Sequence, residues 1–390
     1  MGVDQKLQDM DFSGFFHDIE DLRCRTYPQI GERDFAHLKK VEWYGRLASV
    51  FGYLTCWIVI NPFSAFGISL GQFTRWIVAH HVIHGGYDKV PNIPQRYTSK
   101  YFARGWRRFI DWFDWILPEA WSYEHNTLHH YHTGEAKDPD VAERHTQHLQ
   151  QLAIPRLVKY LLLFLVATSW KITYYAPNTM SVLDPDSGKR LRSQHVLYLT
   201  FGNILDLSRT QVRKLWMLCY LPYGIVHFIV IPLLFFPLGK AAVMTVFANK
   251  VLAECLTNLH SFITIVPNHT ADDIYRFDYH YDNREEFYLH QVLGSTNYQC
   301  GSELVDYLSL WLNYQIEHHI FPDLPMLKYQ QIQPEVKSIC DRNNIPYVQE
   351  NIFRRLKRMA DVCVGKTKMR ELKWFPSEQS SSIAHNQKLV

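Results

Sequence analysis

Histidine is the residue type whose spacing in this chain predicts chemistry. The chain has 390 residues and 20 histidines, many of them gathered in short stretches. The first cluster, HHVIH, covers residues 80–84, the second, HNTLHHYH, residues 125–132, and the third, QIEHH, residues 315–319. An imidazole ring is costly inside a core unless its nitrogens find partners. Three such clusters therefore predict metal binding rather than ordinary packing.

Within the clusters, histidines recur four residues apart, as in His80 with His84 and His125 with His129. In a helix, this spacing places both rings on one face. One such pair is more often a surface coincidence than a ligand pair, but three clusters together offer about seven or eight imidazoles. That number exceeds the four ligands of a tetrahedral zinc site and suits two metal ions. Imidazole binds Zn, Cu, Fe and Ni, so the metal stays open at this point.

A zinc hydrolase is the nearest chemical alternative, and its motif is incomplete. The HExxH motif takes its general base from the Glu. Here His81 occupies that position, and Glu124 precedes the second pair instead of lying within it. The seven cysteines include no CxxC spacing, so neither a disulfide framework nor a thiolate metal site is predicted. A net charge of +3 indicates no nucleic-acid partner.

Four long apolar runs are expected to position the clusters. They cover residues 47–60, 65–79, 216–236 and 241–266. Three of them approach the roughly 20 residues that span a bilayer, and Asn61–Ser64 and Pro237–Lys240 break the four runs into two helical hairpins. Buried helices of a soluble protein are also apolar, but only Arg75, Lys240 and Lys250 among all Lys and Arg lie within the runs and their turns. This charge distribution favours a membrane protein.

The remaining basic residues indicate an orientation. They lie in residues 1–46, 80–215 and 268–390, the segments that two membrane hairpins leave on one side. By the positive-inside rule this side is the cytoplasm, where all three clusters could meet. A fifth apolar stretch, 157–175, contains Lys159 and Lys171. A span there would move the third cluster to the opposite side, so we expect this stretch to lie in the membrane interface or to dip and return.

The runs and clusters together predict an all-α, integral membrane protein. Four transmembrane helices in two hairpins would carry a cytoplasmic helical cap that holds a two-metal site. The expected parts are a cytoplasmic N-terminal segment (1–46), a membrane domain (47–350) and a C-terminal tail (351–390). Residues 101–117 interleave Trp, Phe and Arg, which predicts an amphipathic helix on the headgroup surface or, alternatively, a buried one. We expect residues 377–390 to be disordered and no cleaved signal peptide.

The three clusters resemble the histidine boxes of the membrane fatty acid desaturase superfamily. The third, in LNYQIEHHIFPDLP, resembles that of front-end acyl desaturases, which have Gln where other members have the first His of the box. QVLGSTN before it and QPEVKSICDRNNIPY after it extend the likeness, which runs from about His80 to Tyr347. The resemblance implies an enzyme that introduces a double bond into a fatty acyl chain with two Fe ions, O2 and two electrons.

The resemblance also implies a ligand set. The matching residues are His80, His84, His125, His129, His130, His318 and His319, with His269 as the eighth and His260 as its substitute. If one helix carries both His260 and His269, their nine-residue separation puts them on opposite faces, so only one is expected to bind metal. The side chains expected to orient ligands from behind are those of Gln315, Glu124, Glu317, Asp138, Asp140 and Asp323.

Three features depart from the pattern of the superfamily. His81 stands where an acidic residue is common, and the second box reads HxxxHH, closer to the EHxxxHH of membrane alkane hydroxylases. A di-iron lipid or alkane hydroxylase is therefore the alternative function, followed by a zinc membrane hydrolase or a non-catalytic receptor. Residues 1–46 are too few for the haem domain that front-end desaturases usually carry.

The expected partners follow from the same resemblance. The substrate would be a fatty acyl lipid or an acyl-CoA within a lipid bilayer. The electrons would come from a separate protein, either a ferredoxin or a haem-containing cytochrome with its reductase. The membrane would be the endoplasmic reticulum or a bacterial inner membrane.

Overall fold

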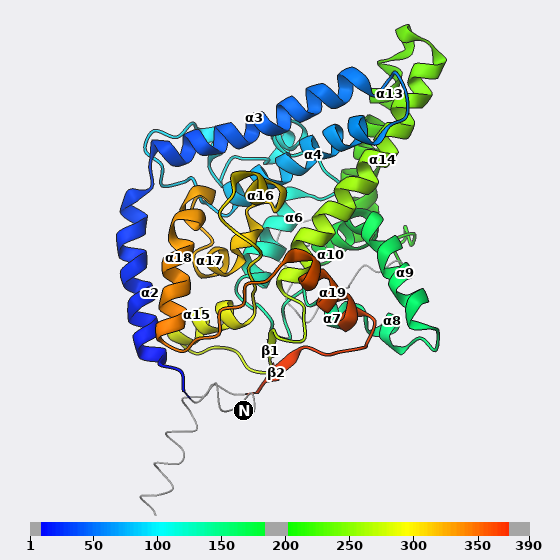
Figure 1. The fold of residues 1–390 in the computed structure, drawn as a ribbon. Coiled ribbons are helices and arrows are strands. Elements are labelled where there is room, and N and C mark those ends of the chain that lie inside the picture. Colours follow the sequence, from blue (N-terminus) through cyan, green and yellow to red (C-terminus); the bar gives the residue numbers. More distant parts are fainter. Residues whose placement is uncertain (1–8, 184–201, 374–390) are drawn as a thin grey trace, which may run out of the picture. The chain divides into compact units, whose positions relative to one another are not determined.

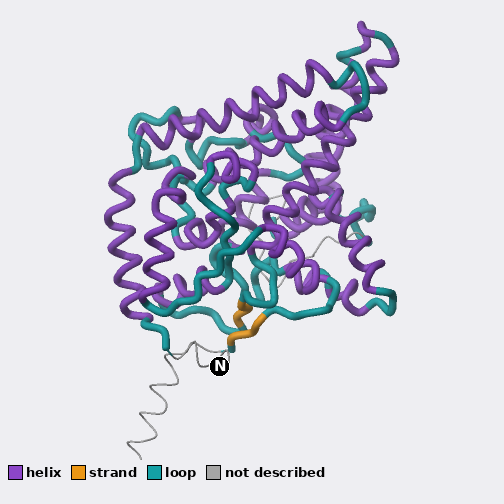
Figure 2. Tube along the Cα trace, viewed as in Figure 1, coloured by secondary structure: helices purple, strands orange, loops and turns teal. Residues whose placement is uncertain are grey.

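The structure, a computed structural model, describes residues 9–183 and 202–373. Helices dominate this part of the chain, with one pair of three-residue strands (Figures 1 and 2), so the all-α prediction is confirmed. The chain divides into two compact units. Unit 1 contains Met1–Ile30, His129–Ala153 and Val266–Val390, and unit 2 contains Gly31–Leu128 and Ile154–Ile265. The segment expected to be disordered, 377–390, lies outside the described residues.

Unit 2 begins with a hairpin of two long helices, α3 (Glu32–Thr55) and α4 (Pro62–Ile83), which lie side by side (Figure 1). The side chain of Asn61 caps α4 by accepting the Ser64 N–H at 2.8 Å, and Pro62 takes the first helical position. The helices are separated by residues 56–61, so the break starts before the predicted Asn61–Ser64 and overlaps it only at Asn61. Helix α3 begins well before the apolar run at residue 47, because its first half is a polar, capped helix.

Glycines allow α3 and α4 to approach closely. A Cβ on Gly52 would lie 2.7 Å from the backbone nitrogen of Ile68, and one on Gly45 would lie 2.4 Å from Cβ of Thr74. Small residues at such an interface let two helix backbones pack together without a gap.

We expect Gly52→Val to weaken this hairpin. The added methyl groups have no space against the backbone of α4, and overpacking of this kind costs about 1–3 kcal/mol. The measurement is the thermal inactivation midpoint of the detergent-purified protein, which should fall by several degrees. Gly224→Val is the matched control, because nothing lies within 4 Å of its added Cβ. Equal midpoints for the two variants would contradict the close-packing explanation.

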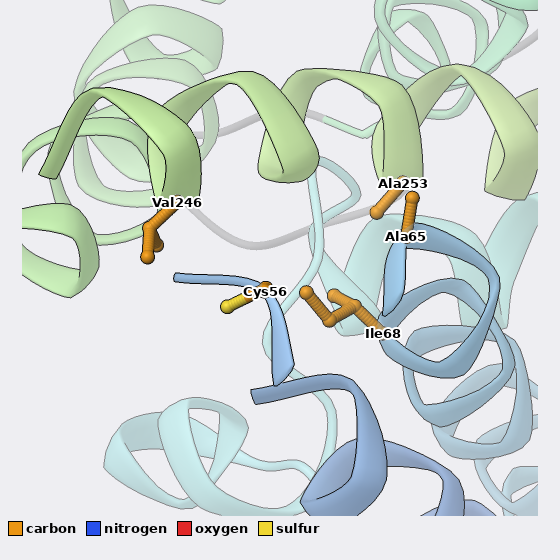
Figure 3. Close-up of a cluster of buried hydrophobic side chains, with 5 residues drawn as sticks. All are labelled: Cys56, Ala65, Ile68, Val246 and Ala253. Atoms are coloured by element: carbon orange, nitrogen blue, oxygen red, sulfur yellow. The ribbon is translucent and has the colours of Figure 1, made fainter. Parts of the chain in front are cut away.

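A second pair of long helical segments follows in unit 2. The first, Thr210–Leu238, alternates α-helical and π-helical turns and ends in η9 (Phe236–Leu238). Its parts are α11 (Thr210–Leu215), η7 (Trp216–Tyr220), α12 (Leu221–Ile225), η8 (Val226–Val230) and α13 (Ile231–Leu233). The second is α14 (Lys240–Ile265), which starts at the last residue of the predicted break. Figure 3 shows Val246 and Ala253 of α14 with Cys56, Ala65 and Ile68, a buried apolar cluster.

Among the described residues, one helix is long and apolar enough to cross a membrane, namely Thr210–Leu238. A second candidate is the pair α9 (Arg156–Thr168) and Lys171–Ser181, which bends by 84° at its break. That second part consists of η5 (Lys171–Tyr175) and α10 (Ala176–Ser181). The predicted stretch 157–175 therefore holds a sharp bend rather than one straight helix.

Helix α14 is less apolar than a simple span because it carries charged residues, whose partners lie within unit 2. Glu254 accepts from the Trp115 indole N–H at 2.7 Å and from the Tyr223 hydroxyl at 2.9 Å. Nζ of Lys250 donates to Nδ1 of His227 at 2.8 Å. Met244, in contrast, is 64% exposed on the same helix. The charged side chains of Lys250 and Glu254 therefore find their partners inside unit 2.

The amphipathic helix predicted over residues 101–117 is wrong. Only η3 (Gly105–Arg107) and α5 (Arg108–Asp111) are helical in this stretch, and α6 (Pro118–Tyr123) follows. The chain turns inward after α5, because Asp114 is buried in an ion pair with Lys171 at 2.7 Å. Trp112 is buried as well. A long-range ion pair thus overrides the local helical pattern.

The described part of unit 1 consists of shorter helices and the strand pair. Its helices are α2 (Phe12–Thr26), η1 (Tyr27–Gln29), α7 (Ala142–His145), α8 (Gln147–Gln151), η10 (Val266–Asn268), α15 (Arg284–Leu293), α16 (Glu303–Leu308), η11 (Leu312–Tyr314), α17 (Gln315–Ile320), α18 (Met326–Arg342) and α19 (Ile352–Cys363). Strands β1 (Tyr275–Phe277) and β2 (Arg370–Leu372) are parallel, with Arg276 opposite Glu371. A buried cluster of Val141, Ala271, Ile274, Val362 and Met369 joins the segments around the sheet.

Candidate metal centre

Three histidines of the first two clusters converge within unit 2. His80 and His84 stand at the carboxyl end of α4, and His125 stands on the π-helix η4 (Glu124–His129). The ring centroid of His80 lies 4.9 Å from those of His84 and His125, and His84 and His125 are 5.1 Å apart. One nitrogen from each ring lies within 4.8 Å of the others. These three imidazoles can share one metal ion.

Aromatic rings and one hydrogen bond fix this set. The Asn126 amide N–H donates to the Ile83 carbonyl at 3.1 Å, which fastens η4 to the end of α4. Trp121 stacks on His125 with its centroid 4.7 Å away, and Trp76 meets His80 edge-on at 4.8 Å. Glu124, buried beside the set, accepts from the Asn178 amide at 3.4 Å. Packed rings of this kind limit the motion of the ligands.

Unit 1 gathers the other five proposed ligands. His129, at the end of η4, lies with His269 and His319, and one nitrogen of each is within 4.8 Å of the others. His130 stacks on His319 with centroids 4.2 Å apart, and its ring meets His318 at 4.7 Å. His269 lies just beyond η10, whereas His318 and His319 lie on α17. All except His269 are fully or almost fully buried.

Hydrogen-bond acceptors orient three of these rings through Nδ1. His129 donates from Nδ1 to Oδ1 of Asp138 at 2.9 Å, and His319 donates to Oε1 of Gln291 at 2.9 Å. The Gly294 carbonyl accepts from His269 at 2.9 Å. A ring that donates through Nδ1 presents the lone pair of Nε2, the form that binds a metal ion. The donor set therefore fits a metal ion that takes neutral nitrogen ligands.

The buried carboxyl group of Asp138 is held ionised despite its burial. Burial alone would raise its pKa, but the contact with His129 and the backbone N–H groups of Asp140 and Gly134 hold the pKa below its usual value. Burial lowers the pKa of His269 to about 3, so this ring is neutral. A charged acceptor behind a neutral imidazole raises the basicity of the ligand.

Gln315 touches a proposed ligand directly. Its Oε1 accepts from the Asn268 amide at 3.1 Å, which turns its Nε2–H group toward Nε2 of His269 at 2.8 Å. That contact uses the same lone pair that a metal ion would use. For His269 to bind metal, the Gln315 amide must turn away or exchange its partner.

His260 and Glu317, which the sequence also predicts for the site, have other partners in the structure. The assumption that one helix carries His260 and His269 is wrong, because α14 ends at Ile265. His260 stacks on Phe73 in unit 2, with centroids 3.7 Å apart. Glu317 accepts from Asn297 and from Tyr347, each at 2.7 Å, and burial raises its pKa to about 7. Its described partners therefore anchor α17.

Two acids and one unassigned histidine complete the predicted set. Oδ2 of Asp140 lies 3.9 Å from Nδ1 of His129, beyond hydrogen-bond distance. Asp323 accepts from the hydroxyl group of Tyr27. His81 is buried and stacks on His80 with centroids 4.9 Å apart.

Sequence reasoning missed two residues that orient the ligands. Gln291 accepts from His319, and Oε1 of Gln291 also accepts from the Thr133 hydroxyl at 2.9 Å. Gln291 is the first residue of the QVLGSTN segment. The likeness of this segment to desaturases could have indicated a role for Gln291 at the metal site. Tyr329 was also missed; its hydroxyl lies 3.2 Å from Nδ1 of His318 and donates to the Phe321 carbonyl.

Comparison with known proteins agrees with the histidine pattern. A family model described as fatty acid desaturase matches residues 54–351. The NADPH-dependent stearoyl-CoA 9-desaturase of Mycobacterium tuberculosis is 24% identical over 87% of this chain and 76% of its own length. The acyl-lipid (8-3)-desaturase of Mortierella alpina is 22% identical over 87% and 74%, and the sn-1 linoleoyl-lipid 6-desaturase of Arthrospira platensis is 22% identical over 74% and 72%.

The described helices bring imidazoles together in groups that could hold metal ions. With the family model matched over residues 54–351, the chain belongs to the fatty acid desaturase family. It is an oxidoreductase of lipid metabolism that acts on fatty acyl chains.

Proposed function

We propose that this protein is a membrane di-iron desaturase that removes two hydrogens from an acyl chain with O2 and two electrons. The observation that carries the proposal is the convergence of mostly buried imidazoles in both units, three in unit 2 and five in unit 1. Eight imidazoles are enough for two ions. Iron, when bound, supplies the O2 chemistry that a methylene C–H requires, because no side-chain base can remove so weakly acidic a proton.

The residues of the chain have defined tasks in this proposal. Asp138 and Gln291 orient His129 and His319 through Nδ1, so that Nε2 of each ring is available to metal. Buried aromatic rings such as Trp121 exclude water from the histidines of unit 2. Exclusion of water protects a reactive site from side reactions.

Product analysis tests the proposal against the hydroxylase alternative. The full chain is expressed in a host without polyunsaturated lipids, and its fatty acids are profiled by mass. We expect a product two mass units lighter than its precursor, since two hydrogens are lost and no oxygen is gained. A product sixteen mass units heavier would mean hydroxylation. The same profile gives the acyl chain, and separate CoA and lipid fractions identify its carrier, for which acyl-CoA and acyl-lipid are our candidates.

A four-span topology with cytoplasmic histidines is part of the proposal. It rests on the distribution of Lys and Arg and on the outward apolar faces of the helices, for example Leu54 on α3, 67% exposed. Electrons would reach such a site from a ferredoxin or a haem-containing cytochrome on the cytoplasmic side.

Reporter fusions are expected to confirm this topology. Fusions after residues 140 and 205 should report the cytoplasm. In the proposed topology the chain crosses the membrane twice before each of these positions, so both return to the side of the N-terminus. A fusion after residue 61, in the turn of the first hairpin, is the control and should report the opposite side. Opposite results at 140 and 205 would mean that residues 157–175 cross the membrane.

Gln315→Ala is expected to keep most of the iron and lose turnover. The amide of Gln315 lies 2.8 Å from Nε2 of His269, so it governs how that ring meets the metal. Loss of such a partner costs about 10–100-fold in metal affinity or activity. Gln315→His, which adds a competing ring, should also retain iron and turn over slowly. Normal turnover with an unchanged product in Gln315→Ala would show that the amide has no part in the chemistry.

A further inference from the structure

A second group of histidines in unit 1 surrounds Glu135, outside the eight proposed iron ligands. The Glu135 N–H donates to the His132 carbonyl at 2.8 Å, and this turn brings the two side chains together. Nδ1 of His132 lies 2.8 Å from Oε2 of Glu135, and Nδ1 of His280 lies 2.8 Å from Oε1. Both contacts lie within one unit, so a single folded unit builds the group.

The fold brings His280 to this turn through the strand β1. The Phe277 N–H donates to the Gly134 carbonyl at 3.0 Å, which fastens the start of the 278–283 loop beside Glu135. Gly134 has a φ of 76°, and a Cβ there would lie 3.0 Å from the Phe277 ring. The turn therefore requires glycine.

A third histidine points into the same group and is the stronger sign of a ligand. His290, on α15, has a fully buried side chain, and its Nδ1 lies 3.8 Å from Oε1 of Glu135. Within the described part of the chain, neither of its ring nitrogens has a hydrogen-bond partner. The Phe277 ring stacks on His290 with centroids 3.7 Å apart, and the rings of Tyr279 and Tyr281 meet it at right angles. A buried ring with two unsatisfied nitrogens is costly unless something binds there.

We propose that His132, Glu135, His280 and His290 bind a divalent transition-metal ion of the zinc type. Three imidazoles and one carboxylate are a donor set that zinc accepts in tetrahedral sites. Bonds of about 2.0–2.1 Å place tetrahedral ligand atoms about 3.3–3.4 Å apart. His132, Glu135 and His280 offer ligand atoms within 4.8 Å of one another, and Nδ1 of His290 lies 3.8 Å from Oε1 of Glu135, so the His290 ring must move toward the other three to complete the site.

The site has the character of a structural metal centre. Four protein ligands leave no open position, which distinguishes structural from catalytic zinc. The His280 side chain is 43% exposed, whereas that of His290 is fully buried, so the ion enters from the His280 side. The bound ion would join the turn at residues 132–135, next in sequence to the second histidine box, to the 278–283 loop and to α15.

Metal analysis of the full-length protein tests the site. The iron-loaded, detergent-purified chain is dialysed against ZnCl2 with a weak chelator, and zinc and iron are counted per chain. We expect one zinc ion in the wild type and at least a tenfold weaker zinc affinity in His280→Ala and in Glu135→Gln. His148→Ala, which removes an exposed histidine of α8, is the matched control and should keep the zinc.

Two further results separate this site from the iron centre. His319→Ala should lose iron but keep the zinc, whereas His280→Ala should lose the zinc but keep its iron, which also shows that it is folded. Cobalt in place of zinc should give the intense visible spectrum of a tetrahedral ion, and His290→Ala should lose it. Unchanged zinc binding in His280→Ala, or no zinc in the wild type, would overturn the proposal.

Discussion

Replacement of His319 or His84 by alanine is expected to abolish desaturation and to reduce the iron content, while the protein still accumulates in the membrane. The two residues come from different histidine sets, His319 in unit 1 and His84 in unit 2. Even residues behind the ligands account for about 10–100-fold in metal affinity or activity, so loss of a ligand should exceed 100-fold. Membrane insertion should persist, because it depends on the apolar runs.

The measurement combines iron per chain with the fatty-acid profile of expressing cells. His148→Ala serves again as the control and should match the wild type in both. The wild type should contain two irons per chain, because the ligand number exceeds one site. If both His319→Ala and His84→Ala desaturate normally, the imidazole sets are not the active centre.

Asp138→Ala is expected to have the next largest effect. Its carboxylate accepts from Nδ1 of His129 at 2.9 Å and from the backbone N–H of Gly134 at 2.8 Å. Without it, the His129 ring loses the partner that selects its orientation and its tautomer. Losses of this type cost about 10–100-fold in metal affinity or activity.

Asp138→Asn separates shape from charge. The amide has the size of the carboxylate but lacks its charge, and its NH2 group cannot accept from Gly134 or His129. We expect the iron affinity of Asp138→Asn, measured by competition with a chelator, to lie between those of the wild type and Asp138→Ala. Asp341→Asn is the control, because this carboxylate is 59% exposed and pairs with Lys337 instead of a histidine. Equal iron affinity in Asp138→Ala and the wild type would contradict the orienting role.

Local patterns in the sequence determined the helical class and the pairing of near neighbours. The i, i+4 spacing of His80 and His84 predicted two rings on one face, and their centroids are 4.9 Å apart at the end of α4. The start of α4 at Asn61 and Pro62 was predictable for the same reason, since a cap and a proline act within one turn. Such features depend on a few adjacent residues, so the sequence contains all the information that they require.

Contacts between distant segments were decided only by tertiary structure. The choice between His260 and His269 depends on where α14 ends and on what packs beside each ring. The buried ion pair of Asp114 with Lys171 prevented the helix that local periodicity predicted for residues 101–117.

The same holds for the side chains that orient the metal ligands and for the group around Glu135. Gln315 and His269 are 46 residues apart, and Glu135 and His280 are 145 residues apart. Spacing along a chain fixes which side chains share a helix face, but it does not fix which helices meet. That choice is made by the burial of apolar faces and by the pairing of buried polar groups, which act between residues that only the folded chain brings together.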